Sequence, residues 1–304
     1  MKNFRFGTAI FLVLMSQNFI YAQESLVGIG SYVFNPLVLS PSFAGKNTGT
    51  LAILQDYRFM GNLGALPGDQ NKNIVSFDYG LVDLNLGLGL AISNSGFGPS
   101  QASIVHLSTA YHLKVGRGET FSFGMRHNMG NVSRDLEGLN RITLSDPTVS
   151  FNTFSEFDYD LDLSGIYSSR KTYVGATIFN VIPEKDLVQD ISTLAFTLFM
   201  GSEYQYSRNI RLAYSAAFVA PTNAGNILYL YGQYFITPQF KVGLHKHAQN
   251  WGFNTVFAQK GFNVFYKYSF LAGPINLMSS HTVGLSYDFI NEQTKIETPI
   301  FFLN

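Results

Sequence analysis

The sequence contains no cysteine and few charged residues. Of its 304 residues, 13% are charged, whereas soluble domains usually carry about 25%. Without cysteine, a disulfide framework and lipidation at a cysteine are both excluded. The formal net charge is zero, so nucleic acid is a poor candidate partner. So little charge predicts a large surface that does not face water.

Long apolar runs are also scarce. Lys2 and Arg5 precede the apolar run Gly7–Met15, so residues 1–22 are predicted to be a secretory signal peptide cut before Gln23. A membrane anchor is the alternative, but a helix needs about 20 apolar residues to span a bilayer. The rest of the chain contains no apolar run of that length. We therefore expect an exported protein that is either secreted or a β-barrel.

Aromatic residues and glycine are abundant, with 28 Phe, 17 Tyr and 28 Gly. The stretch His281–Phe289 alternates large and small side chains, and successive strand side chains point to opposite faces. In a soluble sandwich the apolar face would meet a core and the polar face water. In an outer-membrane barrel the apolar face meets lipid and the polar face lines the lumen. One strand does not decide between these folds.

Counting strands and their connections favours the barrel. Period-two runs near 51–59, 84–93, 121–130, 157–164, 262–270 and 281–289 are joined by weaker runs near 72–81, 102–113, 171–180, 192–206, 209–219, 225–236, 239–247 and 250–259. Connections predicted as short, such as 82–83 and 260–261, alternate with longer ones, such as 60–71, 94–101, 131–155 and 247–250. Outer-membrane barrels show this alternation. The sequence therefore predicts an all-β transmembrane barrel of about 14 antiparallel strands over residues 49–289.

Residues 23–48 do not follow the strand pattern. Prolines remove backbone donors and restrict the preceding residue, so this piece is not expected to be a central strand. A barrel of about 14 strands is too wide for its wall side chains alone to fill. We predict a plug-like segment in the lumen, and the alternative is that it only stabilises the barrel by filling it. Its key residues are Tyr32, Phe34, Asn35, Pro36, Pro41, Phe43, Ala44 and Gly45.

The stretches Tyr32–Leu37 and Ser40–Gly45 resemble the N-terminal signature of the PorP/SprF family of type IX secretion system outer-membrane proteins. The family usually has Asn where this chain has Ser40, and Ala-Tyr where it has Ser42-Phe43. Further similarity lies in Gly64–Asn71, Leu86–Leu90 and Gly284–Phe289.

The resemblance implies an outer-membrane component of the type IX secretion and gliding machinery. Its expected partners are translocon components and a large secreted adhesin-like protein, bound through a C-terminal sorting domain and anchored or shuttled. A plugged channel for small hydrophobic molecules and an inert structural barrel are the alternatives.

The longest connections are the expected recognition sites, because loops on a rigid scaffold carry binding. They are Gly61–Asn71 and Asn131–Thr153, with candidate contacts Leu63, Leu66, Gln70, Asn71, Leu139 and Phe151. We expect these loops to be extracellular and both mature termini periplasmic. The tail 290–304 ends in an apolar tetrapeptide, which could dock on a partner or fold back into the lumen.

No pattern predicts catalysis, a cofactor or a metal site. His245 and His247 share a face, but structural metal sites need about four ligands, so we expect them to line the lumen or its rim. Asp158, Asp160 and Asp162 are expected to face the lumen, balanced by residues such as Arg58, Arg126 or Lys267. No Gly-x-Ser-x-Gly motif surrounds a serine. The glycines of Leu86–Leu90 predict a close approach of a plug or partner to the wall.

Overall fold

The computed structural model describes residues 31–46, 49–59, 70–97, 100–134, 154–182, 194–207, 210–221, 226–247, 250–271 and 279–289. Within these ranges fourteen strands form one closed barrel. The strands are β1 (Gly49–Phe59), β2 (Gln70–Leu81), β3 (Leu86–Phe97), β4 (Ser100–Gly116), β5 (Glu119–Arg134), β6 (Phe154–Ser168), β7 (Thr172–Phe179), β8 (Ala195–Ser207), β9 (Ile210–Pro221), β10 (Ile227–Phe235), β11 (Phe240–His247), β12 (Asn250–Gln259), β13 (Phe262–Leu271) and β14 (Ser279–Asp288).

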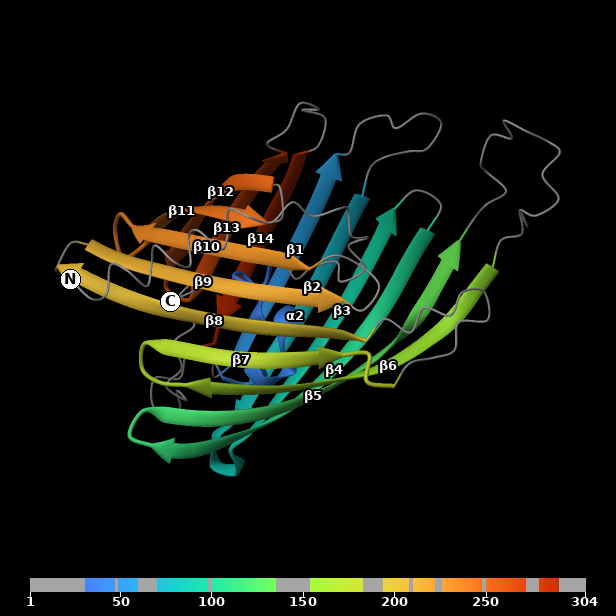
Figure 1. Ribbon diagram of the computed structural model, residues 1–304, viewed down its shortest axis with the longest axis horizontal. Helices are drawn as coiled ribbons and strands as arrows, with labels where there is room; N and C mark the ends of the chain where they lie inside the picture. Colours follow the sequence, from blue (N-terminus) through green and yellow to red (C-terminus); the bar gives the residue numbers. More distant parts are fainter. Residues whose placement is uncertain are drawn as a thin grey trace.

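Each strand pairs antiparallel with its neighbours in the chain, and β1 closes the barrel against β14 (Figure 1). The closing register places Thr50 opposite Asp288 and Phe59 opposite Ser279. Closure removes the free sheet edges that a bilayer cannot tolerate. The predicted fourteen-stranded antiparallel barrel is confirmed.

The predicted alternation of inward and outward side chains is also confirmed. On β3, Leu88, Leu90 and Ile92 are 45%, 42% and 46% exposed, whereas Ala91 and Ser93 are 9% and 6% exposed. The outer face of the wall is therefore apolar and the inner face small or polar, which is the arrangement of a membrane barrel. The closing strand repeats the pattern, because exposed Val283, Leu285 and Tyr287 alternate with buried residues such as Thr282, Ser286 and Asp288.

The connections alternate between the two ends of the barrel. One end carries the short connections, including 117–118, 208–209 and 260–261, and we call it the short-connection end. The other end carries 60–69, 135–153, 180–194 and 272–278, and we call it the long-connection end.

Two connections predicted to be long are not. Residues near 94–101 and 247–250 belong mostly to strands, and only 98–99 and 248–249 connect them. The polar residues Asn94, Gln101 and Ser103 lie on the outward faces of β3 and β4 above the apolar residues. These polar side chains therefore belong to parts of the strands that extend beyond the lipid, and not to loops.

The inner segment, residues 31–46, precedes β1 and contains a short helix α2 (Pro36–Leu39) and a 3-10 turn η2 (Pro41–Phe43). It contains no strand, as predicted. A second 3-10 turn, η3 (Val82–Leu84), connects β2 to β3. None of the helices in the described ranges is long and apolar enough to cross a bilayer. The predicted signal peptide (residues 1–22), residues 23–30 and the tail 290–304 lie outside the described residues.

Candidate functional site in the lumen

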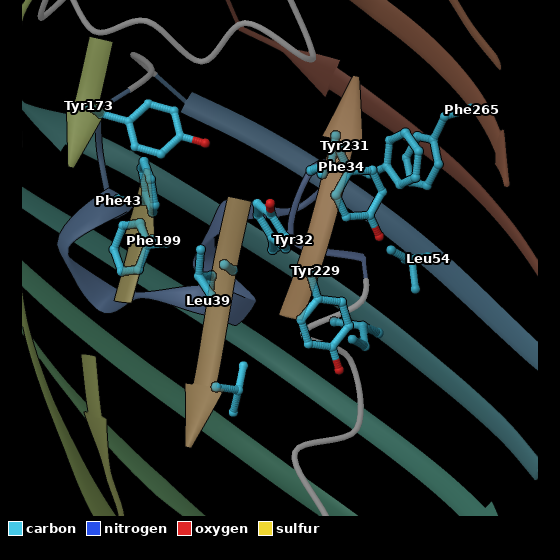
Figure 2. Close-up of a cluster of buried hydrophobic side chains, with 14 of the residues drawn as sticks. Tyr32, Phe34, Leu39, Phe43, Leu54, Tyr173, Phe199, Tyr229, Tyr231 and Phe265 are labelled. Carbon is cyan, nitrogen blue, oxygen red and sulfur yellow. The ribbon is translucent and has the colours of Figure 1, made fainter. Parts of the chain in front are cut away.

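The inner segment lies inside the barrel, in the half nearest the short-connection end. Its wall partners Asp78, His112 and Ser168 lie within four residues of a strand end at a short connection. Figure 2 shows its aromatic side chains meeting aromatic residues of the wall. All of its side chains are buried except those of Pro36 and Val38, which are half-buried.

A tight turn at the start of the inner segment directs two aromatic rings to different parts of the wall. The N–H groups of Phe34 and Asn35 both donate to the carbonyl of Ser31. The Tyr32 hydroxyl shares a 2.6 Å hydrogen bond with the Ser215 hydroxyl. The Phe34 ring stacks on Phe265, with centroids 4.1 Å apart. Stacked aromatic pairs of this kind add about 0.5–1.5 kcal/mol beyond the area they bury.

The prolines explain why this segment turns instead of pairing. Pro36 and Pro41 begin α2 and η2, positions where the missing N–H removes no helical hydrogen bond. Before them, Asn35 donates through Nδ2 to the Ser76 hydroxyl at 2.9 Å. After Pro41, the Phe43 ring lies 5.7 Å from Tyr173 and 5.8 Å from Phe199, centroid to centroid.

Ala44 and Gly45 approach the wall at its glycines. A side chain at Gly87 would collide with the carbonyl group of Ala44, and one at Gly80 would collide with Gly45. Gly45 itself has a φ of +65°, which favours glycine. The predicted close approach at the glycine row is confirmed.

Polar wall residues fix the same turn. The Ala44 carbonyl lies 2.9 Å from His112 Nε2, and the Gly45 N–H donates to Asp78 Oδ2 at 3.0 Å. Backbone groups that lie inside a barrel need such partners.

Arg126 connects the inner segment to an ion pair in the wall. Its Nη1 donates to the carbonyls of Leu37, at 2.7 Å, and Val38, at 3.3 Å. Its Nη2 lies 2.7 Å from Asp162 Oδ2, and the two side chains are 9% and 1% exposed. Asp162 Oδ1 accepts from the N–H of Asn180, where β7 leads into the next connection. One buried charge pair therefore holds the inner segment, the wall and the start of a long connection.

Burial also changes the chemistry of the inner segment. Burial lowers the pKa of Lys46 from 10.5 to about 7, and its Nζ donates to the Ser168 hydroxyl at 3.1 Å. Burial raises the pKa of Tyr32 well above its ordinary value, so this phenol stays protonated. Both pKa shifts favour the uncharged form of the side chain.

The two histidines His245 and His247 and the acidic series lie on the inner wall, as expected. His245 Nε2 lies 2.8 Å from the Ser269 hydroxyl, and the rings of His245 and His247 stack on Tyr231 and Tyr229. Within the described ranges no group of three His, Asp or Glu side chains is placed to hold a metal ion.

Of the acidic series, Asp162 pairs with Arg126, one of the three cations expected to balance it. Asp160 accepts a hydrogen bond from Asn128 Nδ2.

Two sets of site residues were predicted, one in the inner segment and one in the long connections. All eight key residues of the inner segment lie in the lumen against the wall. The predicted loop contacts Leu63, Leu66, Leu139 and Phe151 lie outside the described residues.

Gln70 and Asn71 are not in a loop, because β1 and β2 remain paired through Tyr57–Asn71 and Arg58–Gln70. Asn131 likewise belongs to β5. The boundaries predicted for both loops were therefore wrong at these residues, since the strands continue beyond the lipid.

Sequence reasoning missed several residues that hold the inner segment, among them Asp78, His112, Ser164 and Thr177. Each occupies an ordinary inward position of the alternating pattern. Arg126 was predicted only as a counter-charge to the acidic series. The usable signal was an ionisable residue on the small-residue face, since such a group inside a barrel needs a partner.

Comparison with known proteins agrees with this fold. A crystal structure of the Ralstonia pickettii toluene transporter TbuX is similar, with a TM-score of 0.52 and 12% identity over 86% of this chain and 94% of TbuX. A mutant of the monoaromatic hydrocarbon channel TodX has a TM-score of 0.51 and 10% identity, over 88% and 95% of the two chains. At these identities the likeness concerns the fold alone.

Comparison with curated proteins gives no match. The model of the family described as type IX secretion system membrane protein PorP/SprF matches residues 22–299, which include all fourteen strands and the inner segment. The chain therefore belongs to the PorP/SprF family of type IX secretion system membrane proteins.

Proposed function

We propose that this outer-membrane barrel binds a large secreted adhesin-like protein through its C-terminal sorting domain and anchors or shuttles it, without a catalytic role or a cofactor. The observation that carries the proposal is the difference between the two ends. The long connections all leave one end of a rigid barrel, and the inner segment occupies the other half of its lumen. Rigid scaffolds place recognition on such connections.

The proposed orientation puts the long-connection end outside the cell and both mature termini in the periplasm, as in barrels whose short turns face the periplasm. Recognition is assigned to the connections that hold Leu63, Leu66, Leu139 and Phe151, with Gln70 and Asn71 at the base of the first. Translocon components are the second class of partner. The inner segment supports this surface by holding the wall in one shape.

The experiment compares two variants for surface display of the secreted partner. In one, residues 61–69 are replaced by a short turn, which leaves the β1–β2 pairing intact. In the other, Asn35 and Pro36 are both changed to Ala. The proposal predicts lost display at normal barrel levels for the first variant, whereas a lower barrel level in the second indicates a structural role for the inner segment. Display that survives loop replacement would remove recognition from that connection.

A plugged channel for small hydrophobic molecules is the second candidate. It is favoured by a lumen that holds a separate segment and by the shared fold with the toluene transporter TbuX. Toluene uptake by cells with and without the barrel distinguishes the two. Barrel-dependent uptake that persists when the secreted partner is deleted would favour the channel.

A further inference from the structure

The outer wall of the barrel carries a cation near the long-connection end of β11. Among the outward strand side chains that the structure describes, Lys246 is the only lysine or arginine. It follows Leu244 on the same face, and Leu244 is 69% exposed, more than any other large apolar side chain in the described ranges. A charge within the hydrocarbon is costly, whereas a lysine near its edge can reach the headgroups. Lys246 therefore lies where the apolar part of β11 meets the lipid headgroups.

The hairpin that carries Lys246 ends close to this boundary. Only residues 248–249 connect β11 to β12, and Lys246 lies opposite Trp251 in the register. Other strands pass from apolar to polar differently, because the outward residues that follow the apolar ones on β2 and β3 are uncharged, as at Asn73 and Asn94. The cation is therefore a feature of this hairpin and not of the membrane boundary in general.

Aromatic rings lie beside the lysine on the same outer face. Lys246 Nζ lies 5.1 Å from the centroid of the Trp251 ring, which is 43% exposed, and a cation over an aromatic face is attracted to it. Phe270 lies opposite Trp251 on β13, and Tyr268 lies opposite Phe253. The Tyr268 centroid is 5.6 Å from that of Phe253 and 6.2 Å from that of Phe270. We call these five residues and Leu244 the β11–β13 surface.

The ammonium group of Lys246 can still donate to a ligand. It has several N–H donors and no acceptor, and the contact with Trp251 engages only the face of the ring. Within the described ranges the structure shows no ion pair between Lys246 and an acidic side chain. At this depth a bilayer supplies an anion in the phosphate groups of its lipids, and basic side chains next to a membrane recognise such headgroups.

We propose that the β11–β13 surface binds a phosphorylated lipid of the outer leaflet, with a phosphate at Lys246 and an acyl chain along Leu244 and Phe253. Charge complementarity selects the phosphate. The exposed apolar and aromatic side chains select a lipid over a free phosphate ion, because they bury an acyl chain. The assignment to the outer leaflet rests on the orientation given with the proposed function, whereas the preference for a phosphate joined to an acyl chain rests on the surface itself.

The test uses the full-length barrel, purified in detergent, and lipid A as the probe. The chain contains a single tryptophan, so tryptophan fluorescence reports on Trp251 alone. The proposal predicts a saturable change of this fluorescence as lipid A is added. Lipid A without its phosphates should bind about tenfold more weakly, as expected for loss of a charged contact. Inorganic phosphate should neither change the fluorescence nor displace lipid A.

Variants of the lysine separate its charge from its packing. Lys246→Met keeps the length of the side chain and should bind lipid A about tenfold more weakly, at the level of the phosphate-free lipid. Lys246→Arg keeps the charge and should bind as the unaltered chain does. Lys260→Met is the matched control, because it removes the same charge from an exposed turn at the short-connection end and should leave binding unchanged. Heat-modifiable migration confirms that each variant is folded.

Several results would overturn the proposal. These are no response of Trp251 to lipid A, equal binding of the phosphate-free lipid, a response to inorganic phosphate that matches the response to lipid A, and unchanged binding by Lys246→Met. Tighter binding of phosphatidylglycerol than of lipid A would overturn the assignment to the outer leaflet.

Surface display of the secreted partner keeps this test separate from the proposed function. Display that needs the barrel, combined with no binding of lipid A, would refute the lipid surface alone. Binding of lipid A combined with display that does not need the barrel would refute the proposed function alone.

Discussion

The two ends of the barrel are built from the same strands but differ in the side chains that these strands carry. At the short-connection end the wall is lined by small and aromatic residues that pack on the inner segment, and the Phe34–Phe265 and Phe43–Tyr173 contacts are typical. At the long-connection end the outward side chains of β3, β4 and β5 are polar, as at Asn94, Gln101 and Asn131. There β6 also continues past the last residue of β7. One end therefore resembles the core of a folded protein, and the other carries polar side chains. Stability and the proposed recognition are therefore assigned to opposite ends of the barrel.

The strongest way to break this comparison is to remove the charge that holds the inner segment. Arg126→Met leaves Asp162 buried without its counter-charge and leaves the Leu37 and Val38 carbonyls without their donor. The expected loss is about 3–5 kcal/mol, measured as a lower temperature of heat-modifiable unfolding. The double variant Arg126→Met with Asp162→Leu should recover part of it. A double variant no more stable than Arg126→Met would contradict the ion-pair interpretation.

A second test compares the two faces of one strand. Leu88→Arg places a charge against lipid, where it should cost about 2–4 kcal/mol near the midplane. Ser93→Arg places the same charge on the inner wall, beside His106, in the half of the lumen away from the inner segment. Folded barrel recovered from the outer membrane should fall for the first variant and much less for the second. Equal recovery would mean that the faces of β3 are assigned wrongly.

A third test sharpens the comparison at the glycines. Gly87→Val should push the Ala44 carbonyl away from the wall and cost about 1–3 kcal/mol, the usual range for overpacking. Gly165→Val is the matched control, because a side chain at Gly165 meets nothing within 4 Å. Unfolding temperatures of the two variants give the result. Similar losses would show that valine harms these strands irrespective of the inner segment.

The smallest expected effect concerns pH. Lys46 has a pKa of about 7 in the folded chain, and its ordinary pKa is 10.5. Between these two pH values the unfolded chain therefore binds more protons than the folded chain. Stability should therefore rise with pH, by about 1.4 kcal/mol at most for each pH unit of this window and by on the order of 1 kcal/mol between pH 6.5 and 7.5. Unfolding temperatures at pH 6.5 and 7.5 measure it. Lys46→Met should flatten the dependence, and Lys260→Met, in an exposed turn, should not.

The sequence by itself determined the wall. Alternation is a local property, so the outward series of β3 and β14 could be recognised without knowing their neighbours. Prolines at 36 and 41 excluded a strand for the inner segment for an equally local reason. The glycines of Leu86–Leu90 also predicted a close approach, although not what would approach.

Only the tertiary structure decided which wall residues hold the inner segment and where the strands end. Tyr32 and Ser215 are 183 residues apart in sequence, and their hydrogen bond exists only because the barrel closes around the inner segment. Gln70 and Asn71 were misplaced in a loop because polar residues occur both in loops and in strands that rise beyond the lipid. Whether such residues pair depends on the neighbouring strand, and for the same reason the point at which β7 stops, Phe179, became known only from the structure.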